Sequence, residues 1–305
     1  MLSIARPSFA FWMWTPETNK WVNPKYAVKE TPQEQLDYAM GIFNSKEYDK
    51  AIDEFNKLIK HYPRSKEAAE AQFYIALALQ NKGQFYQAFK NYQMVVEKYP
   101  FSDRAGDVIK KEYEIANKML EGENDRNKFI TTVVGSDYDV VDVFRTVIKN
   151  APYGEFAAPS QYKIGLYLQG KQLYQESRDE LEKVMNDYPD TEWAKAAKYQ
   201  IALSDAKRST GAQYDQAVTK TAVEEFKRFV DTNPDAELSQ KAQEHLHKLH
   251  EKEAENNFVI AEFYEKQKNY KAAKIYYSTV VEDFANTSWA QKALQKIREL
   301  SSKVQ

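Results

Sequence analysis

The densest group of metal-binding side chains in the sequence is His245, His247 and His250, followed by Glu251. Imidazole and carboxylate groups bind zinc, but a site needs at least three of them converging on the ion. Successive residues of a helix are about 100° apart, so only His247 and His250 share a face. We therefore predict no metal site and expect these residues to lie on a solvated helix.

Other catalytic chemistry has no candidate residues. The chain contains no cysteine, which excludes disulfides, thiolate metal ligands and a cysteine nucleophile. It also lacks a G-x-S-x-G elbow, a phosphate-binding loop, a dinucleotide fingerprint and an H-E-x-x-H helix. We predict no catalytic residue and no cofactor, and hence a protein that is not an enzyme.

The overall charge also limits the choice of partner. The chain has 305 residues, with 43 basic and 45 acidic side chains and a formal net charge of −2. A chain with this charge balance has no net positive charge that would attract nucleic acid. No stretch approaches the roughly 20 apolar residues of a transmembrane helix. We predict protein partners, no nucleic acid and no membrane span.

The chain repeats a short phrase, which gives the architecture. Residues 72–77, 161–166 and 198–203 read QFYIAL, QYKIGL and KYQIAL, and each phrase precedes a second apolar segment that ends near a proline. Repeats of 20–50 residues are typical of solenoids, whose stacked units offer long surfaces for binding other proteins.

Three positions recur in each unit: a small residue in the first helix, a small or apolar residue in the second, and a stop. They are Ala39, Ala51, Pro63; Ala76, Ala88, Pro100; Ala116, Val140, Pro152; Gly165, Ser177, Pro189; Ala202, Ala222, Pro234; and Ala261, Ala273, Ala285. Four of the six units keep the spacing of 12 and 12 residues, as in tetratricopeptide repeats, and in the last of them Ala285 stands where the stop proline would be. We expect insertions around 121–136 and 211–219, a longer helix before Ala261 and a closing helix over 288–302.

These signals predict an all-α fold, a tetratricopeptide-repeat superhelix (α-solenoid) of about six helix pairs plus a C-terminal capping helix. A capping box with proline at the first helical position, Thr31-Pro32-Gln33-Glu34, starts the first repeat. We expect N-terminal repeats over 31–153 and C-terminal repeats with the capping helix over 154–305.

The residues before the first repeat divide into two segments. Residues 1–10 end in Ser8-Phe9-Ala10, the small-residue pattern of a cleavage site, and we interpret them as the remnant of a signal peptide. The alternative is an ordinary flexible N-terminus. Residues 11–30 form an aromatic strap containing Trp12, Trp14 and Trp21. Its amphipathic rings suit a membrane or partner surface. The alternative is that the strap folds back over the first repeat.

A bulky residue stands three positions before each first-helix marker, and five of the six are aromatic. The set, called here the stripe, is Leu36, Phe73, Tyr113, Tyr162, Tyr199 and Phe258. One interpretation is a peptide-binding groove, because aromatic rings supply contact area with few rotors to freeze. The other is that the rings pack between neighbouring first helices as core.

The end of the chain carries a family resemblance. Residues 242–254, then Ile260-Ala261-Glu262-Phe263-Tyr264 and the segment from Tyr270 to Tyr277, are similar to the last repeat of the outer membrane assembly factor BamD (ComL-like) family. There a long helix precedes an "A-x-F-Y" segment and a "Y-x-A-A" helix. The resemblance covers roughly 30–301.

The resemblance implies a role. Members lie on the periplasmic side of the outer membrane, bind the BamA barrel insertase through C-terminal repeats and engage unfolded outer-membrane protein segments with N-terminal ones. It implies a periplasmic protein peripheral to the outer membrane. The partner-binding residues implied are Phe258, Phe263, Tyr264, Tyr270 and Tyr277.

The chain departs from the family in one respect. Members are usually lipoproteins tethered through an N-terminal cysteine, and none of these 305 residues is a cysteine. The alternative function is a soluble YbgF-like tetratricopeptide adaptor in cell-envelope maintenance, since those proteins share the Tyr-Pro repeat style and are not lipidated.

Overall fold

The computed structural model describes residues 13–15, 20–22, 27–129, 140–209, 216–234 and 237–301. The remnant predicted at residues 1–10 lies outside these ranges. The chain divides into two compact units, Met1–Val143 and Phe144–Gln305. The division falls inside helix α6 (Val140–Asn150), whereas the sequence analysis placed a boundary after residue 153.

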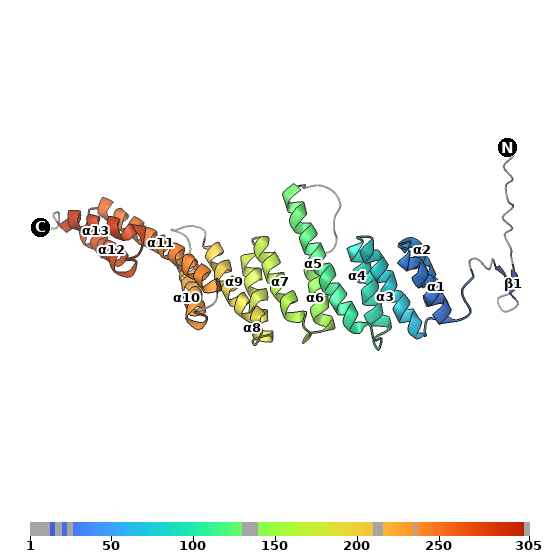
Figure 1. Ribbon diagram of the computed structural model, residues 1–305. Helices are drawn as coiled ribbons and strands as arrows, with labels where there is room; N and C mark the ends of the chain where they lie inside the picture. Colours follow the sequence, from blue (N-terminus) through green and yellow to red (C-terminus); the bar gives the residue numbers. More distant parts are fainter. Residues whose placement is uncertain are drawn as a thin grey trace, which may run out of the picture. The chain divides into compact units, whose positions relative to one another are not determined.

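The first unit consists of antiparallel helix pairs (Figure 1). Its helices are α1 (Pro32–Asn44), α2 (Tyr48–His61), α3 (Lys66–Asn81), α4 (Phe85–Lys98) and α5 (Ala105–Phe129). Each helix packs on the next, and α1 also contacts α3. First helices of neighbouring repeats therefore touch, as expected for stacked tetratricopeptide units.

The same unit contains two short strands that the sequence analysis did not predict. Strands β1 (Met13–Thr15) and β2 (Lys20–Val22) pair antiparallel, with Trp14 opposite Trp21. They lie before the first repeat, so the repeats themselves are all-α, and the predicted fold class is confirmed.

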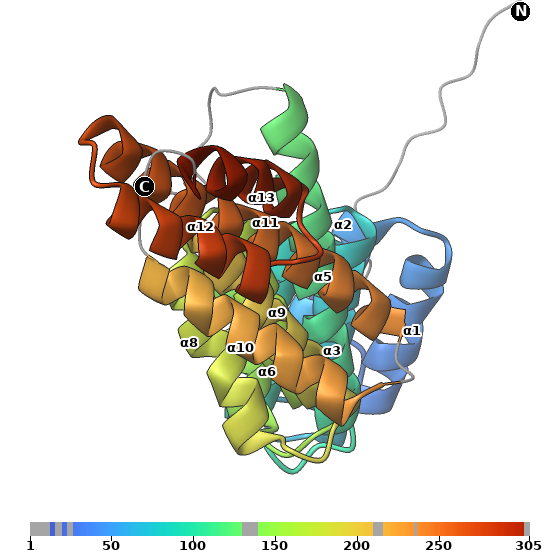
Figure 2. The same cartoon turned by 90° about the vertical axis from the view of Figure 1, so that its left-hand side faces the viewer.

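The second unit continues the pattern with α7 to α13. Its helices are α7 (Ala157–Gly170), α8 (Tyr174–Asp187), α9 (Glu192–Arg208), α10 (Gln216–Thr232), α11 (Glu237–Lys266), α12 (Tyr270–Asp283) and α13 (Ser288–Ser301). Besides sequential neighbours, α7 contacts α9, α9 contacts α11, and α11 contacts α13. Figure 2 shows α11, α12 and α13 side by side.

Side-chain caps start several first helices. The hydroxyl of Thr31 accepts a hydrogen bond from the amide of Glu34 at 3.2 Å, with Pro32 at the first helical position. Ser65 and Thr191 cap α3 and α9 in the same way. These bonds satisfy amides that have no partner inside the helix. The predicted helix start at Thr31 is confirmed.

The turn between the two helices of a repeat uses a left-handed residue. Lys46, Gly83, Gln172 and Lys268 have φ of 62°, 75°, 65° and 58°. Each stands seven positions after its first-helix marker. Only one of the four is glycine, the residue that adopts this conformation without steric cost. The repeat geometry therefore imposes the conformation on the three side-chain-bearing residues.

The marker residues lie at the helix contacts, as the repeat frame predicts. All twelve helical markers are buried: Ala39, Ala51, Ala76, Ala88, Ala116, Val140, Gly165, Ser177, Ala202, Ala222, Ala261 and Ala273. The closest approach is at Gly165, where a Cβ would lie 2.5 Å from Cγ of Leu181. Ser177 Oγ donates to the Gly165 carbonyl at 2.8 Å. Small residues at these positions permit that approach.

The longer helix predicted before Ala261 is confirmed. Helix α11 has 30 residues, and its buried face runs from Ala242 through Leu249 to Phe258 and Ala261. The closing helix is also present as α13. At the predicted insertions, α5 extends to Phe129, and residues 130–139 and 210–215 lie outside the described ranges.

Candidate functional site

Most of the stripe lies in the core. The exposed fractions of Phe73, Tyr162, Tyr199 and Phe258 are 5%, 9%, 5% and 6%. Phe73 packs against Tyr92, its ring centroid at 5.4 Å. Of the two interpretations of the stripe, core packing describes these four side chains. They do not face an open groove, because each ring fills the space beside the neighbouring helices.

The other two stripe residues, Leu36 and Tyr113, are half-buried. Leu36 packs at the edge of the first repeat's core. Burial raises the pKa of the Tyr113 hydroxyl. A peptide-binding role for any of the six stays a prediction.

The residues predicted to bind a partner through the last repeats differ in exposure. Phe258 and Tyr277 are buried, with ring centroids 5.1 Å apart, and they hold α11 against α12. Tyr264 and Tyr270 are half-buried at the edge of the same core. Only Phe263 is open to solvent, with 57% of its surface exposed.

A residue that the sequence analysis missed is also exposed on the last repeat. Ile275, on α12, has 66% of its surface in solvent. Helical periodicity does carry a signal for it, because Ala273 and Tyr277 share the buried face and Ile275, two positions from each, lies on the opposite face. Phe263 and Ile275 are therefore the large apolar side chains of α11 and α12 that are exposed to solvent.

The aromatic strap is only partly described, and Trp12 lies outside the described residues. Trp14 and Trp21 are 45% and 62% exposed, and their rings meet edge to face at 5.7 Å. At the other end of the strap, the Tyr62 hydroxyl donates to the carbonyls of Lys29 and Glu30 at 2.7 and 3.0 Å. The strap thus contacts the first repeat at its last residues, and a membrane or partner role for the tryptophans stays a prediction.

The histidines correct one expectation. His245 stacks on Phe226, with centroids 5.3 Å apart, and His250 meets Phe284 edge to face. Both are half-buried, and burial lowers the pKa of each imidazole. The prediction of a fully solvated helix is wrong for these two, because α11 packs against α10 and α12 on that side. Among the described residues, no group of three or more potential metal ligands converges.

A repeated polar contact links the two helices of a repeat. In the fourth repeat, Gln161 donates from Nε2 to the carbonyl of Glu180 at 3.0 Å and to its carboxylate at 2.6 Å. The same two bonds join Gln35 to Glu54 and Gln72 to Asn91. The signal was present in the sequence, because each glutamine stands four positions before its marker.

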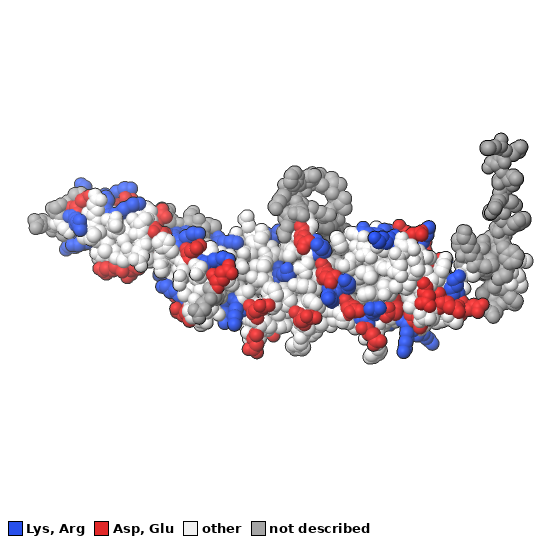
Figure 3. Space-filling view, in the orientation of Figure 1, with Lys and Arg blue, Asp and Glu red and all other residues white. Residues whose placement is uncertain are grey.

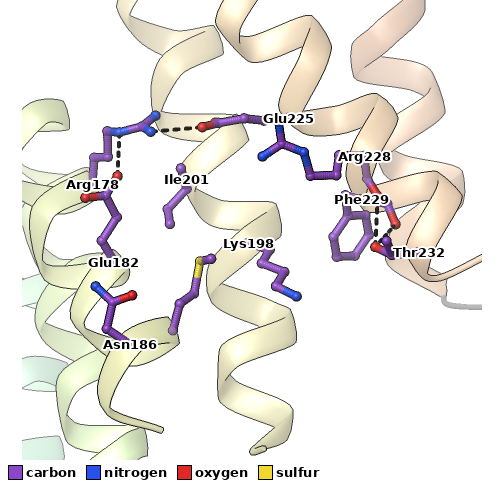
Figure 4. Close-up of a pocket in the computed structure, with 10 residues that line it drawn as sticks. Arg178, Glu182, Asn186, Lys198, Ile201, Glu225, Arg228, Phe229 and Thr232 are labelled. Carbon is purple, nitrogen blue, oxygen red and sulfur yellow. Dashed lines mark hydrogen bonds and ion pairs between the residues drawn. The ribbon is translucent and has the colours of Figure 1, made fainter. Parts of the chain in front are cut away.

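The second unit also contains a pocket of about 370 Å³ between α8, α9 and α10, which the sequence analysis did not predict (Figure 4). It is lined by Arg178, Glu182, Met185, Asn186, Lys198, Ile201, Glu225, Arg228, Phe229 and Thr232. These residues are spread over more than 50 positions of the sequence, so only the packing of three helices brings them together.

Arg178 organises the charges at one side of this pocket. Its Nε lies 3.0 Å from Glu182, and a second nitrogen lies 2.9 Å from Glu225. The guanidinium also pairs with the buried carboxylate of Asp205, which Arg208 approaches to 3.2 Å. Arg178 therefore pairs with one carboxylate from each of α8, α9 and α10.

Elsewhere the surface carries mixed charge. On the face drawn in Figure 3, acidic and basic side chains lie interspersed over the helices of each unit. This distribution agrees with the formal net charge of −2. No helix among the described residues is both long enough and apolar enough to cross a membrane.

Comparison with family models gives two matches. A model described as YfiO, outer membrane lipoprotein, matches residues 152–304. A tetratricopeptide repeat model matches residues 35–65 and 70–102. The first covers half of the chain, and the second covers the first two helix pairs. A search of curated proteins found no match.

Solved structures with tetratricopeptide repeats are similar at low identity. MamA (41-end) from Desulfovibrio magneticus RS-1 is 14% identical, over 69% of this chain and 99% of that one, with a TM-score of 0.35. A tetratricopeptide repeat protein from Parabacteroides merdae is 10% identical, over 90% and 100%, with a TM-score of 0.37. A thermophilic one from Thermus thermophilus is 16% identical, over 71% and 99%, with a TM-score of 0.30. At these scores the likeness carries no argument, and the fold class rests on the helix packing and the repeat model.

Proposed function

Since the chain belongs to the YfiO family of outer membrane lipoproteins, we propose that it is a periplasmic scaffold, peripheral to the outer membrane, in the assembly of outer-membrane β-barrel proteins. Its C-terminal repeats bind a barrel insertase of the BamA kind. Proteins of this family, like tetratricopeptide repeats in general, bind other proteins. The identity of the partner and the location at the outer membrane are what we propose.

The observation that carries the proposal is the exposure of Phe263 and Ile275 on α11 and α12. Both lie inside the region that the family model matches. Burial of either side chain by a partner would be favourable by about 1.5–3 kcal/mol, so a contact made here would be stabilising. Phe258 and Tyr277 hold the two helices that present them.

Unfolded barrel segments are the proposed second class of partner. The sequence analysis left a peptide-binding groove along the aromatic stripe as one of two interpretations, but four stripe rings are core. In the first unit, Tyr38 and Met94 are exposed apolar residues, at 43% and 37%, and are available for such segments. Unfolded barrel segments therefore bind the N-terminal repeats through side chains that are exposed to solvent, and not through the buried rings of the stripe.

Affinity purification from detergent-solubilised envelopes tests the insertase contact. The variants are Phe263→Asp and Ile275→Asp, and the matched control is Leu173→Asp, which places the same charge at another exposed apolar residue of the same unit. A carboxylate in the contact removes apolar burial and leaves a charge to be desolvated, so we expect at least about a tenfold loss of copurified insertase.

The control should keep the insertase, and the circular dichroism of all three variants should match that of the unchanged protein. Undiminished recovery with both variants would refute the assignment of this surface. Absence of the insertase from the eluate of the unchanged protein would refute the proposed function itself.

A further inference from the structure

The pocket between α8, α9 and α10 has no part in the function proposed above. Its volume of about 370 Å³ is at the small end of the range for ligand sites, roughly 300–1,000 Å³. It therefore suits a short segment rather than a folded domain. All of its lining residues belong to the second unit, so its shape depends on the packing of three consecutive helices alone.

The floor of the pocket is apolar. Ile201 and Phe229 contribute surface while remaining 4% and 3% exposed, and Met185 is half-buried beside them. Phe229 is fixed by Tyr199, at a centroid distance of 5.7 Å. An apolar side chain that enters the pocket thus meets a rigid surface, and the flexible thioether of Met185 can adjust to its shape.

The charge that the pocket offers to a ligand is positive. Arg178 is already paired with Glu182 and Glu225. Lys198 and Arg228 are exposed, and the side chain of neither forms an ion pair or hydrogen bond with any other residue in the described part of the chain. They extend from α9 and α10 into the space between the helices (Figure 4). A ligand therefore meets two cations that are free to pair.

One polar atom of the pocket lacks a partner. Glu225 Oε2 is buried and accepts no hydrogen bond from the described residues, although the other oxygen pairs with Arg178. Burial raises the pKa of this carboxyl group. Because this oxygen is enclosed by the protein, a ligand in the pocket pairs with the exposed Lys198 and Arg228 and not with this oxygen.

We propose that this pocket binds a short segment of a partner protein in which an Asp or Glu side chain is adjacent to an apolar one. The carboxylate pairs with Lys198 and Arg228, and the apolar side chain packs on Ile201, Phe229 and Met185. The site is a second contact of the scaffold, separate from Phe263 and Ile275.

The carboxylate of a peptide fits the lining better than a phosphate group does. Lys198 and Arg228 attract either anion, so the apolar floor decides between them. Inorganic phosphate has no apolar part that could cover Ile201, Phe229 and Met185. The combination of cations and apolar surface therefore selects an acidic-apolar peptide.

A randomised heptapeptide library displayed on phage tests the proposal with the whole 305-residue chain immobilised. Parallel selections use the unchanged protein, the double variant Lys198→Gln/Arg228→Gln, and the double control Lys195→Gln/Arg298→Gln. The control removes one lysine and one arginine that are exposed in the same unit and outside the pocket. All of the substituted side chains are exposed, so folding should be preserved.

We expect the unchanged protein and the control to enrich peptides with Asp or Glu next to Leu, Ile, Phe or Met. The most enriched peptide, synthesised and titrated by fluorescence anisotropy, should bind the pocket variant at least tenfold more weakly. Its amide analogue, with Asn or Gln in place of the acid, should show the same loss on the unchanged protein.

Enriched peptides without an acidic residue, equal binding to the pocket variant, or no enrichment over the starting library would each overturn the proposal. So would full displacement of the peptide by inorganic phosphate at equal concentration. The insertase recovered with the pocket variant should remain unchanged, because its contact lies on other helices. The two proposals can therefore fail independently.

Discussion

Gly165 offers the sharpest test of the helix packing. It is the first-helix marker of the fourth repeat, on α7, and a Cβ built there would lie 2.5 Å from Cγ and 2.7 Å from Cδ2 of Leu181. Non-bonded carbons prefer about 3.5–4.0 Å, so the added methyl is roughly 1 Å too close. Leu181 is fully buried, so any displacement of its side chain must move other residues of the core.

The expected magnitude for Gly165→Ala follows from two opposing effects. Overpacking a core site typically costs about 1–3 kcal/mol, and the two short contacts here favour the upper part of that range. Alanine favours the helix over glycine by about 1 kcal/mol, which subtracts from the cost. The net loss should be about 1–2 kcal/mol, or a Tm lower by roughly 2–8 °C for a unit of this size.

Urea unfolding followed by circular dichroism measures the loss, and Gly170→Ala provides the control. Gly170 is the last residue of the same helix, and apart from its chain neighbours and the backbone of its own helix no described atom lies within 4 Å of the position of its Cβ. This variant should be unchanged or slightly more stable. If Gly165→Ala were as stable as the unchanged protein, Gly165 would not be at a close helix contact, and the repeat frame would be wrong in the fourth repeat.

Three further changes probe the same structure. Ala88 is fully buried at the contact of α3 with α4, so Ala88→Leu should overpack this contact. It should lower the free energy of unfolding, measured by urea titration, by about 1–3 kcal/mol. An unchanged Tm would contradict the repeat frame in the second repeat. Gln161→Leu should remove both hydrogen bonds to Glu180 and lower the free energy of unfolding by about 1–3 kcal/mol. The control Gln295→Leu, at an exposed position, should change it little. Equal stability of the two variants would mean that the buried contact does not stabilise the fold. Burial raises the pKa of Glu253 above 4.5, so the folded protein holds this proton longer than the unfolded chain, and stability falls as pH rises through the folded pKa. Glu253→Gln should therefore gain stability relative to the unchanged protein as pH rises from 4.5 in a series of urea titrations, and parallel curves would exclude this effect.

The sequence by itself determined the repeat frame. Small residues 12 positions apart, helix caps such as Thr31 and proline stops are local signals, and they depend on neighbours within a few turns of chain. The long helix α11 followed from the same rule, because a helix that is extended by whole turns keeps Leu249, Phe258 and Ala261 on one face.

Which aromatic rings reach solvent was decided only by tertiary packing. Phe73 and Phe263 are alike as residue types, yet one is 5% and the other 57% exposed, because the neighbouring repeat covers the first and none of the described helices covers the second. The left-handed conformation of Lys46, Gln172 and Lys268 could not be predicted from the sequence either, because lysine and glutamine have no local preference for it.

The pocket depended most on the tertiary structure. Arg178, Lys198 and Arg228 stand on three different helices, and each alone reads as an ordinary solvated charge. The packing of α8, α9 and α10 pairs Arg178 with three carboxylates and leaves the other two cations without a partner in the described chain. Which charges lie near one another depends on their distances in the folded chain, and the sequence does not give these distances. For that reason the pocket could not be predicted from the sequence.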